Sequence, residues 1–314
     1  MDPPFSYVGL DVFGPWEVIT HCTRGGQANS KRWAVLFTCM FTRGVHIEVI
    51  ESMTSSSLIN ALRRFFSIRG PAKQLRSDCG MNFVGASREL KMSENEQTAV
   101  REYLLERRCS WVFNPPHSSH MGGAWEHMIG ITRRILDSML LKDRYTQLTH
   151  EVLVTFMSEV TAIINAQPLV PVSTDPEFPF IQTPSMLLTQ KAGNLPTPPE
   201  DFSKKDMLQC QWKRVQALSE TFWNMWRKDY LGTLQSRRKW FHKHRNIKEG
   251  DIVLLKNKQV KRNEWPMGII VKAIPSTDGL VRKVEVKTVQ HRTTKVYHRP
   301  ISELVYLLSS DQTM

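Results

Sequence analysis

The first 165 residues alternate between two apolar patterns, and this alternation constrains the fold more than any other feature. Apolar runs of the length of strands lie at residues 7–13, within 32–51 and at 110–113, and a further short strand is expected at 73–77. Apolar residues that recur every three or four positions, as on one face of a helix, lie at 54–68, 94–107, 124–141 and 150–165. Strands interleaved with helices in this way predict an α/β domain built on one sheet.

Glycine and proline mark the boundaries of these expected elements. Gly14-Pro15 is predicted to end the first strand at Phe13. Thr42-Arg43-Gly44 divides residues 32–51 into the two strands of a hairpin. Gly70-Pro71 stops the helix at 54–68, and serines 55–57 can cap its start.

The sequence changes character after about residue 167, where the predicted α/β domain (1–167) ends. Residues 168–202 hold eight prolines among polar residues, which predicts a Pro-rich linker over 168–205. Helical spacing of aromatic and apolar residues predicts a long basic amphipathic helix over 206–245. A period of two then predicts a small basic β-barrel over 246–308, with strands at 251–255, 267–271, 281–286 and 294–297.

The net charge of +12 lies entirely in the last third of the chain. Residues 1–200 carry 19 Lys+Arg and 19 Asp+Glu, whereas residues 201–314 carry 23 and 11, and 23 − 11 = 12. A neutral domain followed by a basic one suggests a chemical unit joined to a unit that holds a polyanion. The alternative is a basic solubilising segment, but its regular apolar patterning is typical of a folded one.

The apolar runs and the cysteines of the sequence argue against a membrane protein, a secreted protein and a zinc-binding protein. The chain has no run of about 18 apolar residues and no signal-peptide pattern at its start. Its five cysteines are scattered, without CxxC spacing, which indicates reduced thiols in place of a disulfide framework or a zinc site. We therefore expect an intracellular protein.

Three acids stand where a metal site would need them. Asp11 interrupts an apolar strand, Asp78 follows the end of another, and Glu126 lies in the first turn of a helix. A carboxylate inside an apolar strand is costly unless it is paired or binds a cation. Converging carboxylates repel one another, and divalent metal ions relieve that repulsion. Oxygen ligands favour two Mg²⁺ or Mn²⁺ ions, which suit chemistry at phosphorus.

Each acid also has an ordinary structural interpretation. Asp11 could accept hydrogen bonds in a turn at a strand end, and Asp78, two residues before Gly80, could be a turn residue. Glu126 could simply favour a helix N-terminus through the helix dipole. Spacing alone leaves these alternatives open.

The sequences around the three acids resemble the catalytic blocks of retroelement integrases, most closely those of BEL/Pao-type long-terminal-repeat retrotransposons. The blocks are residues 7–15 (YVGLDVFGP), 77–86 (SDCGMNFVGA) and 114–126 (NPPHSSHMGGAWE). Residues 265–269 (WPMGI), 278–282 (DGLVR) and 299–304 (RPISEL) look like the domain that follows the integrase core in that group. The resemblance covers nearly the whole chain except the expected linker.

This resemblance implies a fold and a reaction. The fold is a ribonuclease-H-like core, a mixed five-stranded sheet flanked by helices, with Asp11 on the first strand, Asp78 after the fourth and Glu126 on a helix. The implied reaction is 3′-end processing of element DNA, followed by attack of the freed 3′-hydroxyl on a target phosphodiester. The implied partners are element ends, target DNA and further copies of the chain, in the nucleus. A nuclease without joining activity uses the same metal chemistry, so the residues alone leave that step open.

Several polar residues are weaker candidates for DNA contact. They lie in the loops beside the acids (Asn82, Asn114, His117 and His120) and near the end of the long helix (Arg237, Arg238, Lys239 and Lys243). Turn formation and an ordinary solvated helix face are the alternatives. The expected barrel could bind DNA or a chromatin partner.

Two departures from the retroviral pattern leave a further alternative open. Forty-seven residues separate Asp78 from Glu126, more than in retroviral integrases, and the excess fits the helix expected at 94–107. No His-His-Cys-Cys module precedes the first strand. The rival to an active enzyme is therefore a domesticated DNA- or chromatin-binding protein without catalysis.

Overall fold

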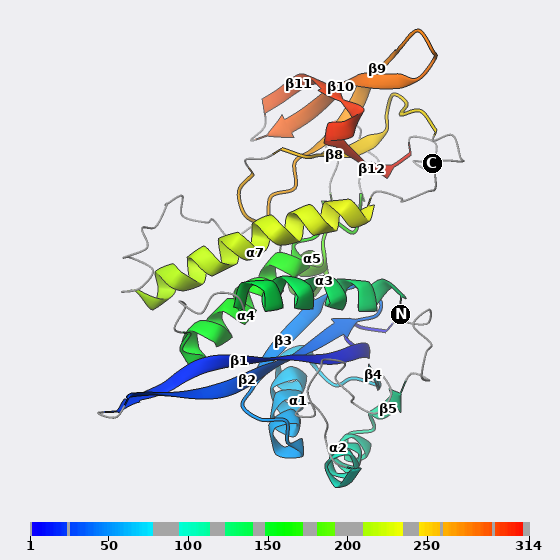
Figure 1. Ribbon diagram of the computed structural model, residues 1–314. Coiled ribbons are helices and arrows are strands. Elements are labelled where there is room, and N and C mark those ends of the chain that lie inside the picture. The colour runs from blue at the N-terminus through cyan, green and yellow to red at the C-terminus, as the bar shows by residue number, and fades with distance from the viewer. Residues whose placement is uncertain are drawn as a thin grey trace. The chain divides into compact units, whose positions relative to one another are not determined.

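The structure of the protein is a computed structural model (Figure 1). It describes residues 2–23, 26–77, 94–113, 123–140, 148–171, 181–191, 210–234, 245–257, 260–290 and 293–309. The chain divides into two compact units. The first comprises Met1–Asn165 with Pro199–Trp226, and the second comprises Ala166–Pro198 with Arg227–Met314.

A five-stranded mixed sheet forms the centre of the first unit, in the order β3-β2-β1-β4-β5. The strands are β1 (Tyr7–Thr23), β2 (Gly26–Cys39), β3 (Val45–Ile50), β4 (Gln74–Ser77) and β5 (Ser110–Phe113). β1 is antiparallel to β2, which is antiparallel to β3, whereas β4 is parallel to both β1 and β5. β1 is thus the strand at which the sheet changes from antiparallel to parallel pairing.

Four helices cover the two faces of this sheet. α1 (Ser55–Arg69) and α2 (Glu94–Glu106) lie on one face, and α3 (Gly123–Leu140) and α4 (His150–Asn165) lie on the other (Figure 1). Both faces bury apolar side chains, as expected for a sheet covered on both sides. The predicted ribonuclease-H-like arrangement, a mixed five-stranded sheet flanked by helices, is confirmed.

The ends of α1 show how local chemistry sets its length. Thr54, not one of the predicted serines 55–57, is the N-cap residue, and its side-chain oxygen accepts a hydrogen bond from the Ser57 backbone N–H. Thr54 has extended backbone angles, which an N-cap residue requires, whereas the serines are already helical. At the other end Gly70 has φ +84°, a left-handed conformation that favours glycine, so the predicted stop is confirmed.

The prediction that Gly14-Pro15 ends the first strand is wrong. β1 and β2 remain paired beyond it, with a register shift between Phe13 and Trp16. Proline has no N–H to donate to the ladder, and a β-bulge accommodates it by leaving that residue unpaired. Gly14 has φ +115°, which completes the bulge without strain.

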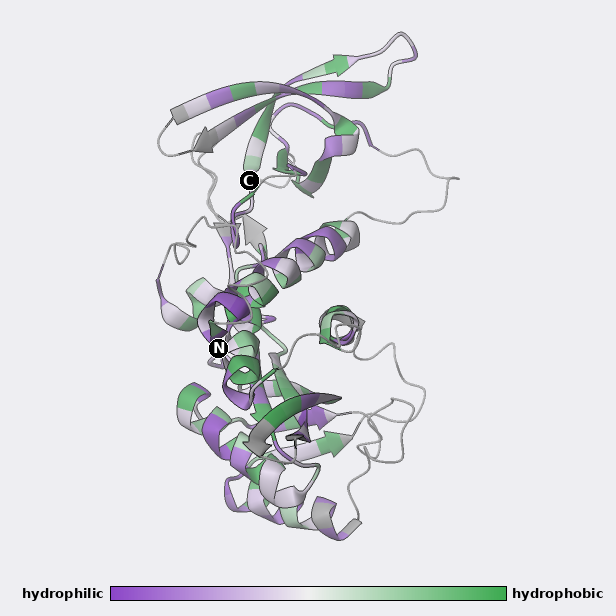
Figure 2. Ribbon diagram, turned by 60° about the vertical axis from the view of Figure 1, so that its left-hand side comes forward, coloured by the Kyte–Doolittle hydropathy of each residue, from purple (hydrophilic) through white to green (hydrophobic). Residues whose placement is uncertain are grey.

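The second unit contains a five-stranded antiparallel sheet in the order β11-β10-β9-β8-β12. Its elements are β8 (Ile252–Leu255), β9 (Met267–Pro275), β10 (Val281–Gln290), β11 (Thr293–Pro300), the short 3₁₀ helix η3 (Ile301–Glu303) and β12 (Leu304–Leu308). Hydrophobic and hydrophilic residues alternate along several of these strands (Figure 2), as expected for a sheet with one buried face. Val253, Ile270, Val284 and Val286 are core residues on that face.

The remaining elements lie between the two sheets in the sequence. α7 (Gln211–Leu234) begins in the first unit, and its residues from Arg227 onward belong to the second. The rest of the helix expected over 206–245 lies outside the described residues, except for Cys210 and Arg245. Within the expected linker the structure places the two-stranded ladder of β6 (Val170–Pro171) and β7 (Ile181–Gln182) and the helix α5 (Pro184–Thr189). None of the described helices is long and apolar enough to cross a membrane.

We predict that Gly14→Ala destabilises the first unit. A Cβ at this position would lie 3.0 Å from the Arg32 carbonyl oxygen and 3.3 Å from the Trp33 Cα, at a φ that L-residues rarely adopt. The expected loss is about 1–3 kcal/mol of unfolding free energy. Thermal unfolding followed by circular dichroism should show a lower midpoint.

Gly130→Ala is the matched control for this change. Gly130 lies inside α3, and a Cβ there would meet nothing within 4 Å. Alanine should therefore stabilise the helix by about 0.5–1 kcal/mol. Equal midpoints for the two variants would contradict the role assigned to the bulge.

Candidate active site

Asp11 is the one acid of the proposed triad whose side chain lies within the described part of the chain. It is half-buried in β1, between the fully buried residues Leu10 and Val12, and its backbone pairs with Leu36 of β2. Its Oδ1 accepts a hydrogen bond from the Val12 backbone N–H, at 2.9 Å. The carboxylate is therefore held at a fixed point on the central part of the sheet.

The register of the sheet decides which face Asp11 occupies. Its neighbour Leu10 pairs with Phe37 of β2, and the ring of Phe37 stacks on Phe65 of α1 with 4.2 Å between centroids. Leu10 and Phe37 therefore point to the α1 face, because directly paired residues share a face. Successive side chains alternate, so Asp11 points to the opposite face. That face is covered by α3 and α4, and α3 packs against β1 (Figure 1).

Asp78 lies outside the described residues, but the strand that leads to it is well defined. β4 ends at Ser77, the residue before Asp78, and runs parallel to β1 with Gly9 opposite Arg76. The Ser77 hydroxyl oxygen accepts a hydrogen bond from Trp111 Nε1 of β5 at 3.0 Å. The end of β4 is thus fixed beside the segment of β1 that carries Asp11.

Glu126 lies in the first turn of α3, which begins at Gly123. Its side chain is outside the described residues, so the structure places its backbone alone. Because α3 packs against β1 on the face to which Asp11 points, the helix start and Asp11 belong to the same side of the sheet. Of the three predicted positions, the structure describes the Asp11 side chain and the Glu126 backbone, and both belong to the α3 side of the sheet. Asp78 lies outside the described residues, so the predicted triad stays a prediction.

The weaker candidates are not tested by the structure. All eight lie outside the described residues: Asn82, Asn114, His117, His120, Arg237, Arg238, Lys239 and Lys243. Asn114 follows the last residue of β5 directly. Within the described part of the chain, no group of three or more His, Cys, Asp or Glu side chains could hold a metal ion.

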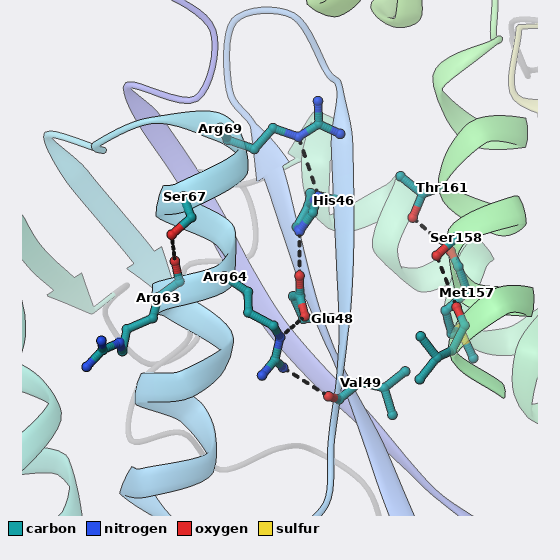
Figure 3. Close-up of polar contacts among 11 residues, drawn as sticks. His46, Glu48, Val49, Arg63, Arg64, Ser67, Arg69, Met157, Ser158 and Thr161 are labelled. Carbon is teal, nitrogen blue, oxygen red and sulfur yellow. Dashed lines mark hydrogen bonds and ion pairs between the residues drawn. The ribbon is translucent and has the colours of Figure 1, made fainter. Parts of the chain in front are cut away.

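A polar cluster on the other face of the sheet was not predicted from the sequence. Its members are His46 and Glu48 of β3 with Arg64 and Arg69 of α1 (Figure 3). His46 Nε2 lies 2.9 Å from Glu48 Oε1, and Arg69 Nε lies 3.4 Å from His46 Nδ1. Arg64 contacts the second Glu48 oxygen and donates to the Val49 carbonyl at 3.2 Å. The alternation of His46 and Glu48 along one strand is the signal that could have indicated a shared face.

This cluster joins α1 to the edge strand β3. A guanidinium can only donate, so His46 Nδ1 must accept from Arg69, and His46 Nε2 then donates to Glu48. Burial of Glu48 alone would raise its pKa, but the hydrogen bonds from His46 and Arg64 outweigh burial, so its pKa is lowered from the ordinary 4.5. All four side chains are used in holding the helix to the sheet, so we assign the cluster a structural role.

We predict that Glu48→Gln destabilises the protein at neutral pH and less so in acid. A lowered carboxyl pKa contributes stability that is present above the unfolded-state pKa and is lost as pH falls through the folded-state pKa. Neutral glutamine should cost about 1–3 kcal/mol at pH 7. Urea unfolding of wild type and variant between pH 7 and pH 4 measures the difference, which should narrow with falling pH.

The exposed Glu102 of α2 provides the control, because Glu102→Gln makes the same chemical change away from the cluster. That variant should match the wild type at every pH. A Glu48→Gln difference that stays constant down to pH 4 would contradict the assigned ion pairing.

Comparisons with known proteins match parts of the chain. Residues 210–307 match the model of a family of unknown function (DUF5641). No curated protein matches the chain at a significant level. A chain in the cryo-electron-microscopy structure of the simian T-cell lymphotropic virus intasome, in complex with the PP2A regulatory subunit B56 gamma, is similar. It is 13% identical with a TM-score of 0.38, over 98% of this chain and 80% of that chain.

Two structures of the HTLV-2 integrase catalytic core domain in complex with magnesium are also similar to this chain. The trimeric form is 15% identical with a TM-score of 0.33, over 52% of this chain and 87% of that chain. The dimeric form has the same identity and TM-score and covers 88% of that chain.

Proposed function

We propose that this chain is a divalent-metal-dependent DNA integrase of the BEL/Pao retrotransposon type, with Asp11, Asp78 and Glu126 as its catalytic carboxylates. The observation that carries the proposal is the parallel pairing of β1 with β4, because the residue after β4 is Asp78. The sequence blocks around the three acids provide the reaction type. The fold by itself would support any enzyme that uses clustered carboxylates.

The ligand set that these residues offer suits Mg²⁺ or Mn²⁺. Carboxylate oxygens are hard ligands, and the Asp11 carboxylate is half-buried on a strand whose flanking side chains are apolar. Two ions bound there would supply the Lewis acidity that activates an attacking oxygen at phosphorus and stabilises the leaving one. Asp11, Asp78 and Glu126 are the residues that would hold them.

The chain itself contributes positioning. The hydrogen bond from Val12 orients the Asp11 carboxylate, and the one from Trp111 to Ser77 fixes the strand that precedes Asp78. These constraints lie on a rigid sheet and not on a loop, which suits a site that must hold two phosphate oxygens and an attacking hydroxyl in line. A 3′-hydroxyl of element DNA is the proposed nucleophile, and a target phosphodiester is the proposed electrophile.

The proposed partners follow from this chemistry and from the charge distribution. Element ends and target DNA are polyanions, and the net charge of +12 on residues 201–314 suits them. We propose that copies of the chain assemble on two DNA ends in the nucleus. A chromatin partner for the C-terminal sheet is a second candidate ligand.

Strand transfer is the direct test. Purified protein, Mn²⁺ and a duplex oligonucleotide with the element-end sequence should yield joined products longer than the substrate. Asp78→Asn should abolish them, because the amide is a poorer ligand and carries no charge. Undiminished joining by this variant would overturn the proposal, whereas products that stop at cleavage would identify a nuclease.

Asp137→Asn is the matched control for that assay. Asp137 lies on the same helix as Glu126, three turns further on, and makes an ion pair of 3.8 Å with Arg133. Burial raises its pKa, and Arg133 only partly offsets this effect. The change from Asp to Asn therefore alters charge on α3 without touching the triad, and joining should persist.

Metal binding provides an independent test that needs no DNA. Isothermal titration of Mg²⁺ into wild-type protein should show saturable heat that Asp11→Asn abolishes. Circular dichroism verifies that the variant is folded. Equal binding by both proteins would remove Asp11 from the metal site, and a folded wild type that binds no metal would favour a domesticated binding protein.

A further inference from the structure

A cation of β4 lies on the same face of the sheet as Asp11. Arg76 is directly opposite Gly9 in the parallel ladder of β1 and β4, and Gly9 is two residues before Asp11. Side chains alternate along a strand and directly paired residues share a face, so Arg76 and Asp11 both point to the α3 side. A rise of about 3.3 Å per residue and a strand spacing of about 4.8 Å put their Cα atoms roughly 8 Å apart.

The surroundings of Arg76 orient its guanidinium and leave part of it available. Gly9, opposite Arg76, contributes no side chain to the shared face. Arg76 is half-buried, and its Nε donates to Gln74 Oε1 at 2.9 Å. Within the described part of the chain, the two terminal nitrogens of Arg76 have no hydrogen-bond partner. They can therefore donate to an acceptor that the sheet does not supply.

Arg76 differs in its charge environment from two other arginines of the first unit. Arg32 forms an ion pair with Glu51 at 3.3 Å, and Arg64 forms one with Glu48. Arg76 forms no ion pair with any side chain that the structure describes. Its charge is therefore not neutralised by those residues, and it can attract an anion from solution.

We propose that Arg76 binds a phosphate of the DNA strand that enters the site of the three carboxylates. A guanidinium is planar, and its terminal nitrogens match two oxygens of one phosphate. Carboxylates repel phosphates, and a fixed cation roughly 8 Å from the backbone of Asp11 offsets part of that repulsion. This inference rests on the proposed function for the identity of the ligand as DNA. It adds to the site a residue that binds the substrate and holds no metal ion.

The contacts of Arg76 do not indicate a structural role. Its hydrogen bond joins it to Gln74, two residues earlier on the same strand, and Gln74 Nε2 donates to Ser110 Oγ of β5 at 3.4 Å. None of these contacts ties a helix to the sheet, in contrast to those of Arg64 with Glu48 and Val49. A neutral residue at position 76 should therefore leave the fold intact, which circular dichroism verifies.

The salt dependence of duplex binding tests Arg76. A fluorescent 30-base-pair DNA is titrated with the full chain between 50 and 200 mM salt, in the presence of Ca²⁺, a hard cation that carboxylates bind. Arg76→Gln removes the charge and keeps a long side chain. The slope of log affinity against log salt should become less steep by about 0.9, the value for one phosphate contact. Kd at the lowest salt should rise about tenfold to a hundredfold.

Arg63→Gln is the matched control, because Arg63 is exposed on α1, which covers the face away from Asp11. Its slope and Kd should equal those of the wild type. Arg76→Lys keeps the charge without the planar fork, so it should restore the slope while Kd stays above the wild-type value. A wild-type slope for Arg76→Gln, or an equal change for Arg63→Gln, would overturn the inference.

Neutral phosphates locate the contact on the DNA. Duplexes that carry a single methylphosphonate, at successive positions near one 3′ end, are titrated with the wild type and with Arg76→Gln. At the phosphate that Arg76 contacts, the neutral group should weaken binding of the wild type and scarcely affect the variant, because the two changes remove the same interaction. Equal losses for both proteins at every position would contradict a direct contact.

The two proposals fail in different ways. If Arg76→Gln binds duplex DNA as the wild type does, while Asp78→Asn abolishes strand transfer, the Arg76 inference alone fails. If Arg76→Gln shows the lower slope and the insensitivity to one methylphosphonate, but the wild type with Mn²⁺ joins no DNA, the proposed function alone fails.

Discussion

The parallel hydrogen bonding between β1 and β4 is the constraint on which the first unit depends. β1 has an antiparallel partner on one side and a parallel partner on the other, so it must occupy the middle of the sheet. A parallel partner requires a long connection back to the starting edge, and the chain supplies it through β2, β3 and α1. Residues that are distant in the sequence, Asp11 and the end of β4 at Ser77, are thereby brought onto neighbouring strands.

A charged side chain in the interior of this unit needs partners that replace its lost hydration. Arg32 and Glu48 are almost fully buried, and each is surrounded by partners that compensate for lost hydration. Their use is structural, because they tie β2 and β3 to α4 and α1. Asp11 is only half-buried, and its Oδ1 accepts a hydrogen bond from the backbone of its own strand. A carboxylate that keeps access to solvent on a rigid strand is suited to bind a cation from solution, which is why we propose a function for this acid and not for Glu48.

Most elements of the first unit could be predicted because each combines a periodic apolar pattern with a clear stop. The helix 150–165 and the strand 110–113 were predicted with the bounds that the structure shows.

Prediction failed where pairing between strands overrode a local signal. Gly-Pro usually ends a strand, because proline cannot donate to the ladder, but β1 pairs again with β2 after a bulge at Gly14-Pro15. β12 was missed because LVYLL has no alternation, and its role became clear only through pairing with β8. For the candidate site, the sequence predicted Asp11 on a buried strand and Glu126 at the start of a helix. The face of the sheet to which Asp11 points could not be predicted from local sequence, because the register of β1 with β2 decides it.

The bulge at Gly14-Pro15 decides how the strand that carries Asp11 is held. Asp11 lies before the bulge, opposite Leu36, and pairing resumes after it with Trp16 opposite Arg32. A proline cannot donate to a ladder, so pairing with β2 continues past this point because the bulge leaves Pro15 unpaired. The buried Arg32 donates to Ser30, to the Lys31 carbonyl and to His150, and it thereby ties the continuation of the ladder to the start of α4. The strand is therefore fixed on both sides of Asp11, by parallel pairing with β4 before it and by the contacts of Arg32 after it.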